Sequence, residues 1–410
     1  MGAEFDVVVV GGGPGGAACA LELARRGHSV LVCEKKTFPR EKACGDGLTP
    51  RAVRELDAMG LGREVRTWER VRGLRAHGSG RTLELPFPEV GSLPAVGFVK
   101  SRRDLDATVL GAAEAAGAKV LFDMQVSEPI FEEGVVRGVI GKVGGQTEQV
   151  RARYVVCAEG SATKFSRALG RERVASYPIG LAVRQYFRAP SESPGWFDAF
   201  LTLRLGEDHL PGYGWIFPVG DGKVNAGVGL LSSFDGWRAV NLHHLQSHFV
   251  DGLGAQWGVS ESTVCSKPRA GRLFMGGSPW PPHGQGFVLV GDAAGMIKQC
   301  KGEGIAYAYE TGRIAARHIA HALATGGRTG LEGYTRELET VYGPYYRLGR
   351  RFISLIGNPA LMERFVSTAM TSKKLMSWVF VVLGNLEDER ASGAGQKGFK
   401  MLRKLAEMKP

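Results

Sequence analysis

A glycine-rich segment near the N-terminus constrains the fold of this chain more than any other feature. The segment fits the pattern G-x-G-x-x-G at Gly11, Gly13 and Gly16, directly after the apolar run 5–10. The first glycine permits a tight turn, the second lets the backbone approach a pyrophosphate, and the third lets a helix pack closely on a strand. The helix expected over 17–26 would direct its free N–H groups and partial positive charge at those phosphates.

A second apolar run follows that helix and completes a supersecondary unit. It covers 29–34 and ends on Glu34, eighteen residues beyond Gly16. Strand, helix and strand within about thirty residues predict a parallel sheet built from a βαβ unit. A carboxylate at the end of the second strand is placed to accept hydrogen bonds from ribose hydroxyls. We therefore predict a dinucleotide site; the alternative is a glycine turn that holds no ligand.

A second cluster, far downstream, indicates which dinucleotide is bound. The buried-strand pattern at 287–290 leads directly into Gly291 and Asp292, and Gly302-Glu303-Gly304-Ile305 begins a helix that is expected to reach about residue 322. An acid at that point can bond the ribitol hydroxyls of a flavin, and the helix start can direct its dipole at the pyrimidine edge of the ring. The alternative is an Asp N-cap on an ordinary helix. Together with the first motif, the cluster favours FAD over NAD.

Length and composition set limits on the class of protein. The 410 residues are too many for one compact domain and sufficient for two. Glycine accounts for 59 residues, roughly twice the usual ~7%, but without a Gly-X-Y period, which excludes collagen. The hydrophobic content of 44% excludes a disordered chain. A net charge of +11 is compatible with a phosphate-bearing partner or an anionic membrane surface.

Cysteine usage and the short apolar runs indicate the compartment. The six cysteines form no CxxC pair and no metal-ligand spacing, which suggests a reducing compartment and not a disulfide framework. The longest clean apolar run, 378–383, is far shorter than the roughly 20 residues of a membrane-spanning helix. No basic leader or cleavage site precedes the first strand. We expect a cytoplasmic protein that is soluble or peripheral on the inner face of the membrane.

The expected secondary structure changes to alternating strands between the two nucleotide motifs. Alternating strands are expected at 181–187, 214–218 and 223–230, the last two around a two-residue turn at Asp221 and Gly222. The predicted fold class is α/β, a Rossmann-like FAD-binding domain interrupted by an antiparallel-sheet substrate domain and followed by a helical C-terminal region. The expected FAD-binding parts are 1–72, 101–175 and 276–330, the substrate-domain parts are 73–100 and 176–275, and the helical region is 331–410.

Motifs over nearly the first 320 residues carry a family resemblance. Two of them are specific, Cys44-Gly45-Asp46-Gly47 and Tyr213-x-Trp215-x-Phe217-Pro218; the glycine segment with Glu34, the Phe38-Pro39-Arg40 run, Arg102 with Leu105 and Asp106, and the Asp292 block are more widespread. This set resembles the geranylgeranyl reductases, within the larger FAD fold of aromatic hydroxylases and flavin halogenases. The block 291–305 is most similar to the chlorophyll-type branch. The segments 46–51 and 210–213 are similar to the actinobacterial menaquinone-reducing branch, so the two signals differ about the substrate.

The resemblance implies reduction of isolated C=C bonds in the polyprenyl chain of a membrane lipid, a quinone or a tetrapyrrole. Reduced flavin would deliver a hydride to one alkene carbon while an acid delivers a proton to the other, which demands close positioning of both. The expected residues are Cys44, Tyr213 and Trp215 for catalysis, Tyr213, Trp215 and Phe217 for the substrate, and Gly11, Gly13, Gly16, Glu34, Arg40, Cys44, Gly45, Arg102, Asp292, Gly302, Gly304 and Ile305 for the cofactor.

Several of these assignments have ordinary alternatives. Cys44 is either the proton-handling or flavin-flanking residue that the resemblance implies or a small buried hydrophobe. Aromatic residues that alternate on a strand are often plain core, so Tyr213 owes its assignment mainly to the resemblance. The reductant is NADPH, NADH or a ferredoxin. It stays open because Glu159-Gly160 stands where the fold usually carries Asp-Gly.

Two other functions compete with the prenyl reductase. An aromatic hydroxylase or halogenase would use the same fold, but halogenases of this fold typically carry Trp-x-Trp-x-Ile-Pro where this chain has Tyr213-Gly214-Trp215-Ile216-Phe217-Pro218. A non-catalytic prenyl-lipid binding protein is the second alternative, and the intact Gly291-Asp292 element argues against it.

Neither a metal ion nor a nucleic acid is an expected partner, whereas a membrane surface is a candidate. His243, His244 and His248 lack a nearby carboxylate cluster, so no metal site is expected. No nucleic-acid module is present, and the oligomeric state is not predicted. The apolar residues 378–380 and the basic C-terminal residues are a candidate contact with an anionic bilayer, where lipid substrates reside. The basic residues of that end are Lys397, Lys400, Arg403 and Lys404.

Overall fold

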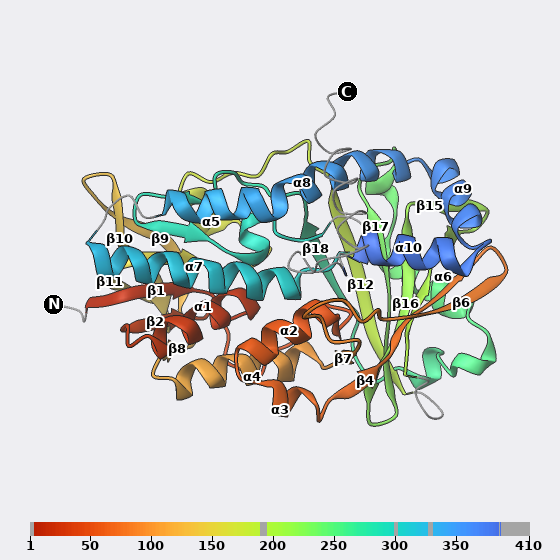
Figure 1. The fold of residues 1–410 in the computed structure, drawn as a ribbon, viewed down its shortest axis with the longest axis horizontal. Helices are drawn as coiled ribbons and strands as arrows, with labels where there is room; N and C mark the ends of the chain where they lie inside the picture. Colours follow the sequence, from red (N-terminus) through yellow and green to blue (C-terminus); the bar gives the residue numbers. More distant parts are fainter. Residues whose placement is uncertain (1–3, 189–194, 299–301, 327–330, 385, 387–410) are drawn as a thin grey trace.

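Two large sheets, one toward each end of the molecule, organise the chain (Figure 1). The computed structural model describes residues 4–188, 195–298, 302–326, 331–384 and 386. The first sheet carries the dinucleotide motif, and the second consists of strands from the middle of the chain together with one earlier hairpin. The observed architecture is the predicted α/β class.

The first sheet is parallel at its centre. Its strands are β1 Glu4–Val10, β2 Val30–Cys33, β8 Lys119–Leu121, β11 Gln146–Cys157, β19 His283–Gly284 and β20 Phe287–Leu289, with β9 Gln125–Glu132 and β10 Val135–Val143 as an antiparallel extension. The order is β19-β20-β11-β1-β2-β8, in which β20, β11, β1, β2 and β8 run parallel. The valines of β1 are all buried, as expected of a strand covered on both faces.

Helices pack side by side against this sheet. They include α1 Pro14–Arg25, α4 Arg102–Ala115 and α7 Ile305–Thr325. The helix α1 begins three residues before its predicted start because Pro14, with its φ preset for a helix, occupies the first helical turn. The helices α1 and α7 cross closely: a Cβ on Gly312 would lie 2.2 Å from the carbonyl oxygen of Gly15.

The second sheet is antiparallel apart from one pair of strands. Its strands are β5 Gly73–Gly78, β6 Arg81–Pro86, β12 Ile179–Arg188, β13 Phe197–Phe200, β16 Gly212–Gly220, β17 Lys223–Leu231 and β18 Arg269–Phe274. The order is β18-β12-β17-β16-β13-β5-β6, with β13 and β5 parallel. The turn between β16 and β17 has positive φ at both Asp221 and Gly222, which confirms the predicted two-residue hairpin.

Smaller elements complete the fold. Between the sheets lie β3 Gly47–Leu48, β4 Glu69–Val71, β7 Gly97–Val99, α2 Pro50–Ala58 and α3 Gly62–Val65. The other small elements are α5 Lys164–Ala168, β14 Leu203–Leu205, β15 Asp208–Leu210, α6 Leu242–Asp251 and short 3₁₀ turns at Trp237–Ala239, Ala255–Trp257, Glu261–Thr263 and Gly291–Ala294.

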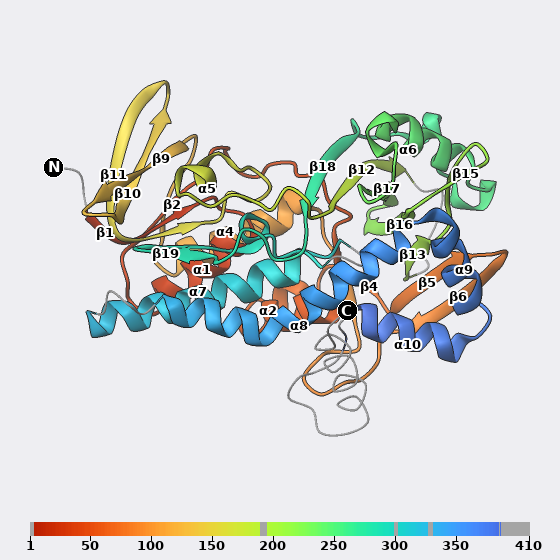
Figure 2. The ribbon, with the colours of Figure 1, turned by 90° about the horizontal axis from the view of Figure 1, so that it is seen from above.

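Three C-terminal helices connect the two ends of the molecule. They are α8 Glu332–Ile356, α9 Pro359–Ala369 and α10 Lys373–Gly384. Seen from above, α8 runs beside α7 and leads to α9 and α10, which cover β5 and β6 (Figure 2). Phe87 and Phe380, 5.7 Å apart between ring centroids, belong to the core between these helices and the second sheet.

The domain limits and the basic C-terminal end were both predicted from sequence. The domain limits stay a prediction, to which the structure adds that β5 and β6 pair with the second sheet. The basic end, Lys397, Lys400, Arg403 and Lys404, lies outside the described residues. None of the helices within the described residues has both the length and the apolar character needed to cross a membrane.

Candidate active site

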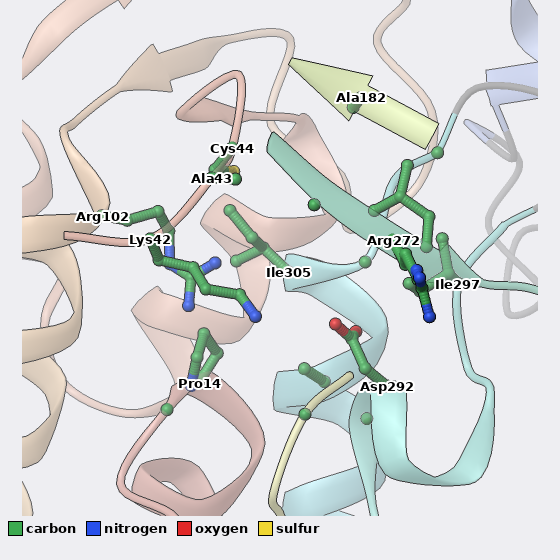
Figure 3. A pocket seen from close by; sticks show the side chains of 18 of the residues that line it. Pro14, Lys42, Ala43, Cys44, Arg102, Ala182, Arg272, Asp292, Ile297 and Ile305 are labelled. Atoms are coloured by element: carbon green, nitrogen blue, oxygen red, sulfur yellow. The ribbon is translucent and has the colours of Figure 1, made fainter. Parts of the chain in front are cut away.

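One cavity of about 460 Å³ extends from the glycine loop of the first sheet to the face of the second sheet. The loop 40–45 forms one wall, and the beginning of α7 forms another (Figure 3). The predicted residues that line it are Gly11, Gly13, Glu34, Arg40, Cys44, Gly45, Arg102, Tyr213, Trp215, Phe217, Asp292, Gly302, Gly304 and Ile305. Residues predicted from three distant parts of the sequence therefore surround the same space.

The glycine loop has the contacts that its motif requires. Gly11 has a φ of +105°, and a Cβ there would lie 2.4 Å from the carbonyl oxygen of Ala158. Gly16 does not line the cavity; a Cβ there would lie 1.9 Å from the carbonyl oxygen of Gly11. Gly13, by contrast, lines the cavity, and the atom nearest its added Cβ is the tip of Arg40, 3.6 Å away. Two glycines thus hold turn and helix together, and the third leaves room for a ligand.

A buried carboxylate stands beside this loop. Glu34 is only 4% exposed and accepts the N–H of Gly12 at 2.8 Å and the N–H of Lys36 at 3.0 Å. These bonds fix its side chain at the end of β2, on the wall of the cavity. The position is the one that the ribose interpretation predicts.

Two predicted arginines are held near the loop by a third residue that sequence reasoning did not assign to the site. Arg102 binds Asp106 through two hydrogen bonds of 2.6 and 2.7 Å, and Arg40 makes an ion pair of 3.0 Å with the same carboxylate. The i, i+4 spacing of Arg102 and Asp106 on α4 is the signal that could have revealed this arrangement. Two guanidinium groups share one carboxylate, which leaves an excess of positive charge at the cavity wall, where an anionic ligand would be stabilised.

The downstream cluster forms the other side of the cavity. Asp292 follows β20 through Gly291, whose φ is +57°, and a Cβ on Gly304 would lie 3.3 Å from Asp292 Oδ1. The helix α7 begins at the next residue, Ile305, so its N-terminus opens beside Asp292. The carboxylate of Asp292 and the helix start are thus adjacent, as predicted.

Lys42 is a cavity residue that the sequence interpretation missed. Figure 3 shows its side chain and that of Asp292 extending into the space from opposite sides. Its Nζ donates a hydrogen bond to Ser161 Oγ at 3.3 Å. Burial lowers the pKa of Lys42, while the nearby charge of Asp292 acts in the opposite direction. The position of Lys42, two residues before Cys44, was the available signal.

The residues predicted for catalysis and substrate binding lie together at the second sheet. Tyr213, Trp215 and Phe217 share one face of β16, with ring centroids 5.9 and 6.3 Å apart. The Cys44–Gly45 segment lies on these rings, since a Cβ on Gly45 would be 3.2 Å from Phe217 and 3.4 Å from the indole nitrogen of Trp215. The thiol and the aromatic wall therefore face the same cavity.

Two proton-bearing groups in this part of the cavity keep their protons at neutral pH. Burial raises the pKa of the Cys44 thiol, and the charge of Asp46 raises it further. Burial also raises the pKa of the Tyr213 hydroxyl well above its ordinary value, with smaller contributions from Cys44 and Glu303. Each group is thus protonated, and not an anion, under ordinary conditions.

The unusual Glu159 has a local structural partner. Its carboxylate accepts the N–H groups of Phe165 at 3.2 Å and Ser166 at 2.8 Å, in α5. It stabilises the first turn of that helix, and it also lines the cavity. The choice among NADPH, NADH and ferredoxin stays a prediction.

His243 and His244 lie at the start of α6, where the helix is capped. Within the residues that the structure describes, no group of three or more His, Cys, Asp or Glu side chains could hold a metal ion. Asn241 instead accepts the backbone N–H groups of His243 and His244 and caps the helix.

The chemistry of the cavity wall fits FAD. The glycine loop has a position open to a pyrophosphate, two arginines supply positive charge beside it, and Glu34 offers a carboxylate to a ribose. Asp292 and the N-terminus of α7 supply an acceptor and a dipole on the opposite side.

Comparisons with known proteins agree with this fit. Residues 4–208 match the family model described as an FAD binding domain. Menaquinone reductase from Mycolicibacterium smegmatis is 37% identical over 94% of this chain and 93% of its own length. Digeranylgeranylglycerophospholipid reductase from Methanoculleus marisnigri is 28% identical over 86% of this chain and 87% of its own. FAD is therefore the cofactor of this protein.

A solved structure supports the fold. The geranylgeranyl bacteriochlorophyll reductase-like protein from Thermoplasma acidophilum superposes with a TM-score of 0.80 at 23% identity, covering 98% of this chain and 100% of its own. At that identity the likeness establishes the arrangement of the two sheets and not the activity.

Proposed function

This chain belongs to the geranylgeranyl reductase family of FAD-dependent oxidoreductases, and from that premise we propose that it saturates isolated C=C bonds in the polyprenyl chain of a membrane quinone. The quinone is favoured over the other lipids because the relative with 37% identity is a menaquinone reductase. The segments 46–51 and 210–213, which are similar to the menaquinone-reducing branch, also favour a quinone.

One observation carries the proposal: the cavity that holds the FAD cradle continues along an apolar surface. A polyprenyl chain has no group to hydrogen-bond, so its binding depends on burial of hydrocarbon, about 25 cal/mol per Å². A compact aromatic substrate would not need lining residues from the C-terminal helices. The apolar residues on this side are Leu181, Val183, Leu230, Leu231, Leu273, Met275, Ile297, Ile356 and Met362.

The chain's own residues position the alkene and supply a proton. Bound FAD, once reduced, supplies the hydride, and the second alkene carbon needs a proton. Cys44 is the proposed donor because its thiol stays protonated and lies on the cavity wall. Tyr213 is the neighbouring hydroxyl that also keeps its proton. Each double bond thus gains two hydrogen atoms, and the two electrons come from an external nicotinamide or ferredoxin.

The aromatic wall gives the alkene a fixed place. Trp215 and Phe217 present flat apolar surfaces toward the Cys44–Gly45 segment. Contact with these rings would exclude water and hold the chain, which an unactivated alkene requires because its reaction depends on alignment. This function for Tyr213, Trp215 and Phe217 is part of the proposal.

Access to a lipid substrate favours a peripheral contact with an anionic membrane surface. The helix α10 exposes Lys374, Leu375 and Trp378, which share one face because they are three and four residues apart. The helix α9, which is joined to α10, contributes Met362 to the cavity. A contact through α10 would place the lipid reservoir near that part of the cavity.

The proposal is tested by incubating the reduced holoenzyme with a polyprenyl menaquinone in the absence of oxygen. Air oxidation of the extract before mass spectrometry converts any quinol back to quinone, so only reduction of the chain persists. We expect products with two extra hydrogen atoms per saturated bond. A parallel incubation with oxygen is the comparison. A product that carries one added oxygen atom, formed only in that incubation, would support the hydroxylase and refute the reductase.

A further inference from the structure

Asp46 is the most deeply buried acid beside the cavity, and no role has yet been assigned to it. It is 0% exposed and sits one residue beyond Gly45, with a φ of +64°, a conformation that non-glycine residues rarely adopt. A carboxylate removed from water is strongly destabilising unless hydrogen bonds compensate it. The groups around Asp46 must therefore supply those hydrogen bonds.

Three donors from three elements converge on this carboxylate. Oδ2 accepts the hydroxyl of Tyr186 from β12 at 2.6 Å and the amide of Asn225 from β17 at 2.7 Å. Oδ1 accepts the backbone N–H of Arg102, at the start of α4, at 3.1 Å. The helix α4 packs on α1 in the core of the first sheet, whereas β12 and β17 belong to the second sheet. Asp46 thus joins the two halves of the molecule beside the cavity.

The same network reaches two of the residues proposed for the reaction, Cys44 and Trp215. Asn225 accepts the indole N–H of Trp215 at 3.0 Å and donates to the carbonyl oxygen of Cys44 at 2.8 Å. The N–H of Asp46 donates to the Cys44 Sγ at 3.3 Å. Through Asn225, the Trp215 indole and the Cys44 carbonyl are each two hydrogen bonds from the Asp46 carboxylate.

We propose that Asp46 is a positioning residue, whose ionised carboxylate holds the Cys44 thiol and the Trp215 indole in fixed relation across the junction of the two sheets. The inference rests on the proposed reductase function. It adds a residue that acts through Cys44 and Trp215 and does not itself line the cavity.

The donor pattern requires a carboxylate and not an amide. A carboxylate can accept from Tyr186, Asn225 and Arg102 at once, since it has only acceptor sites. An Asn at position 46 would turn its NH₂ group toward at least one of these donors and leave that contact broken. A shorter side chain would leave all three donors without an acceptor, which is costly in a buried site.

The charge of Asp46 depends on pH in a defined direction. Burial raises its pKa to about 6, although the hydroxyl of Tyr186, the charge of Arg184, the amide of Asn225 and the N–H of Arg102 act to lower it. Two other titratable groups lie nearby, the Tyr186 hydroxyl on β12 and the Cys44 thiol on the same loop, and burial and the charge of Asp46 raise the pKa of both. The carboxylate is ionised above about pH 6 and takes up a proton below it, when it loses acceptor capacity. The positioning should therefore weaken as the pH falls through this value.

The first test measures Cys44 and needs no substrate. The rate of alkylation of Cys44 by iodoacetamide is followed against pH by peptide mass spectrometry, on protein that carries its FAD, in wild type and Asp46→Asn. Loss of the negative charge should lower the pKa of the thiol and move the midpoint of the profile to lower pH. The exposed Cys265 is the internal reference and should not change. Identical Cys44 profiles in the two proteins would overturn the proposal.

The second test separates positioning from simple folding. Tyr186→Phe removes one donor and keeps the carboxylate, so the pKa of Asp46 should rise and the acid limb of the kcat profile should move to higher pH. Asp46→Asn should retain FAD and lose about 100-fold in kcat, with KM changed less. Asp57→Asn, which removes an exposed partner of Arg66, is the matched control.

The outcomes distinguish this inference from the proposed function. If the wild type reduces no prenyl chain, the function fails, and the alkylation profiles still test Asp46. If the wild type is active but Tyr186→Phe leaves the acid limb in place, the positioning role is wrong. The Tyr186→Phe result remains decisive should Asp46→Asn fail to fold.

Discussion

Cys44 belongs both to the cavity wall and to the buried hydrogen-bond network around the Asp46 carboxylate. Its side chain lies on the cavity wall, while its carbonyl oxygen accepts a hydrogen bond from Asn225. The thiol keeps its proton because burial and the charge of Asp46 both raise its pKa. A neutral thiol at this position can give a proton to a carbon atom that receives a hydride nearby.

Substitution of Cys44 therefore should affect the reaction and not the cofactor. Cys44→Ala removes the proton donor and is expected to lower kcat by about 10²–10⁴-fold, while the flavin absorbance of the purified protein stays at the wild-type level. Turnover and the ratio of flavin to protein absorbance are the measurements. Cys265→Ser, at an exposed cysteine, is the control. A Cys44→Ala enzyme with unchanged turnover would show that Cys44 only fills space.

Two glycines in helices α1 and α4 differ in the space beside them. Gly16 belongs to α1, but the space beside it is filled by the carbonyl oxygen of Gly11. Gly111 belongs to α4, and a Cβ there would have no neighbour within 4 Å. The same substitution should thus have opposite effects on the two helices.

Gly16→Ala should push the turn away from α1 and reduce FAD content and thermal stability together. Gly111→Ala should raise the free energy of unfolding by roughly 0.5–1 kcal/mol, the cost of glycine in a helix relative to alanine. Thermal unfolding and flavin absorbance of both variants check this. Normal FAD content in Gly16→Ala would contradict the proposed packing of the glycine loop.

The exposed face of α10 makes a separate prediction at the level of the element. Trp378 is 53% exposed and Leu375 is 38% exposed, next to the exposed Lys373 and Lys374. Replacing both apolar residues by serine should weaken binding to phosphatidylglycerol vesicles at least about tenfold, because each apolar side chain contributes about 1.5–3 kcal/mol when buried. Co-sedimentation with vesicles is the measurement.

Phe131 provides a matched control for the vesicle experiment. It is 51% exposed but belongs to β9, at the opposite end of the molecule from α10 (Figure 2). Phe131→Ser should leave binding unchanged, and added salt should weaken the wild-type interaction by screening the lysines. Equal loss of binding in both variants would indicate non-specific association and refute the role of α10.

At the scale of the whole molecule, local spacing predicted the cofactor half of the site better than the buried network. Gly11, Glu34 and Asp292 each follow a strand of one parallel sheet, so strand-end position was enough to bring them to one edge. Asp46 contacts Tyr186 and Asn225 across 140 and 179 residues of sequence. Such contacts depend on how the two sheets meet, which no local pattern encodes.

Local sequence patterns also predicted only some of the residues in the apolar part of the cavity. The aromatic residues of β16 were predicted from a motif, but Ile356 and Met362 come from helices with no motif. Their place on the cavity follows from the path of α8 and α9 over the second sheet. The sequence therefore predicted the cofactor and the class of reaction, and the structure supplied the apolar surface that extends from the cofactor side of the cavity.

The central claim is that this surface brings a polyprenyl chain, and not a quinone ring, to the flavin. The most direct measurement locates the added hydrogen atoms in a menaquinone treated with the reduced holoenzyme without oxygen and then oxidised in air. Tandem mass spectrometry should find both hydrogen atoms in the isoprenoid fragments, with the naphthoquinone fragment unchanged. A product whose chain is unaltered would contradict the claim, however fast the enzyme oxidises its reductant.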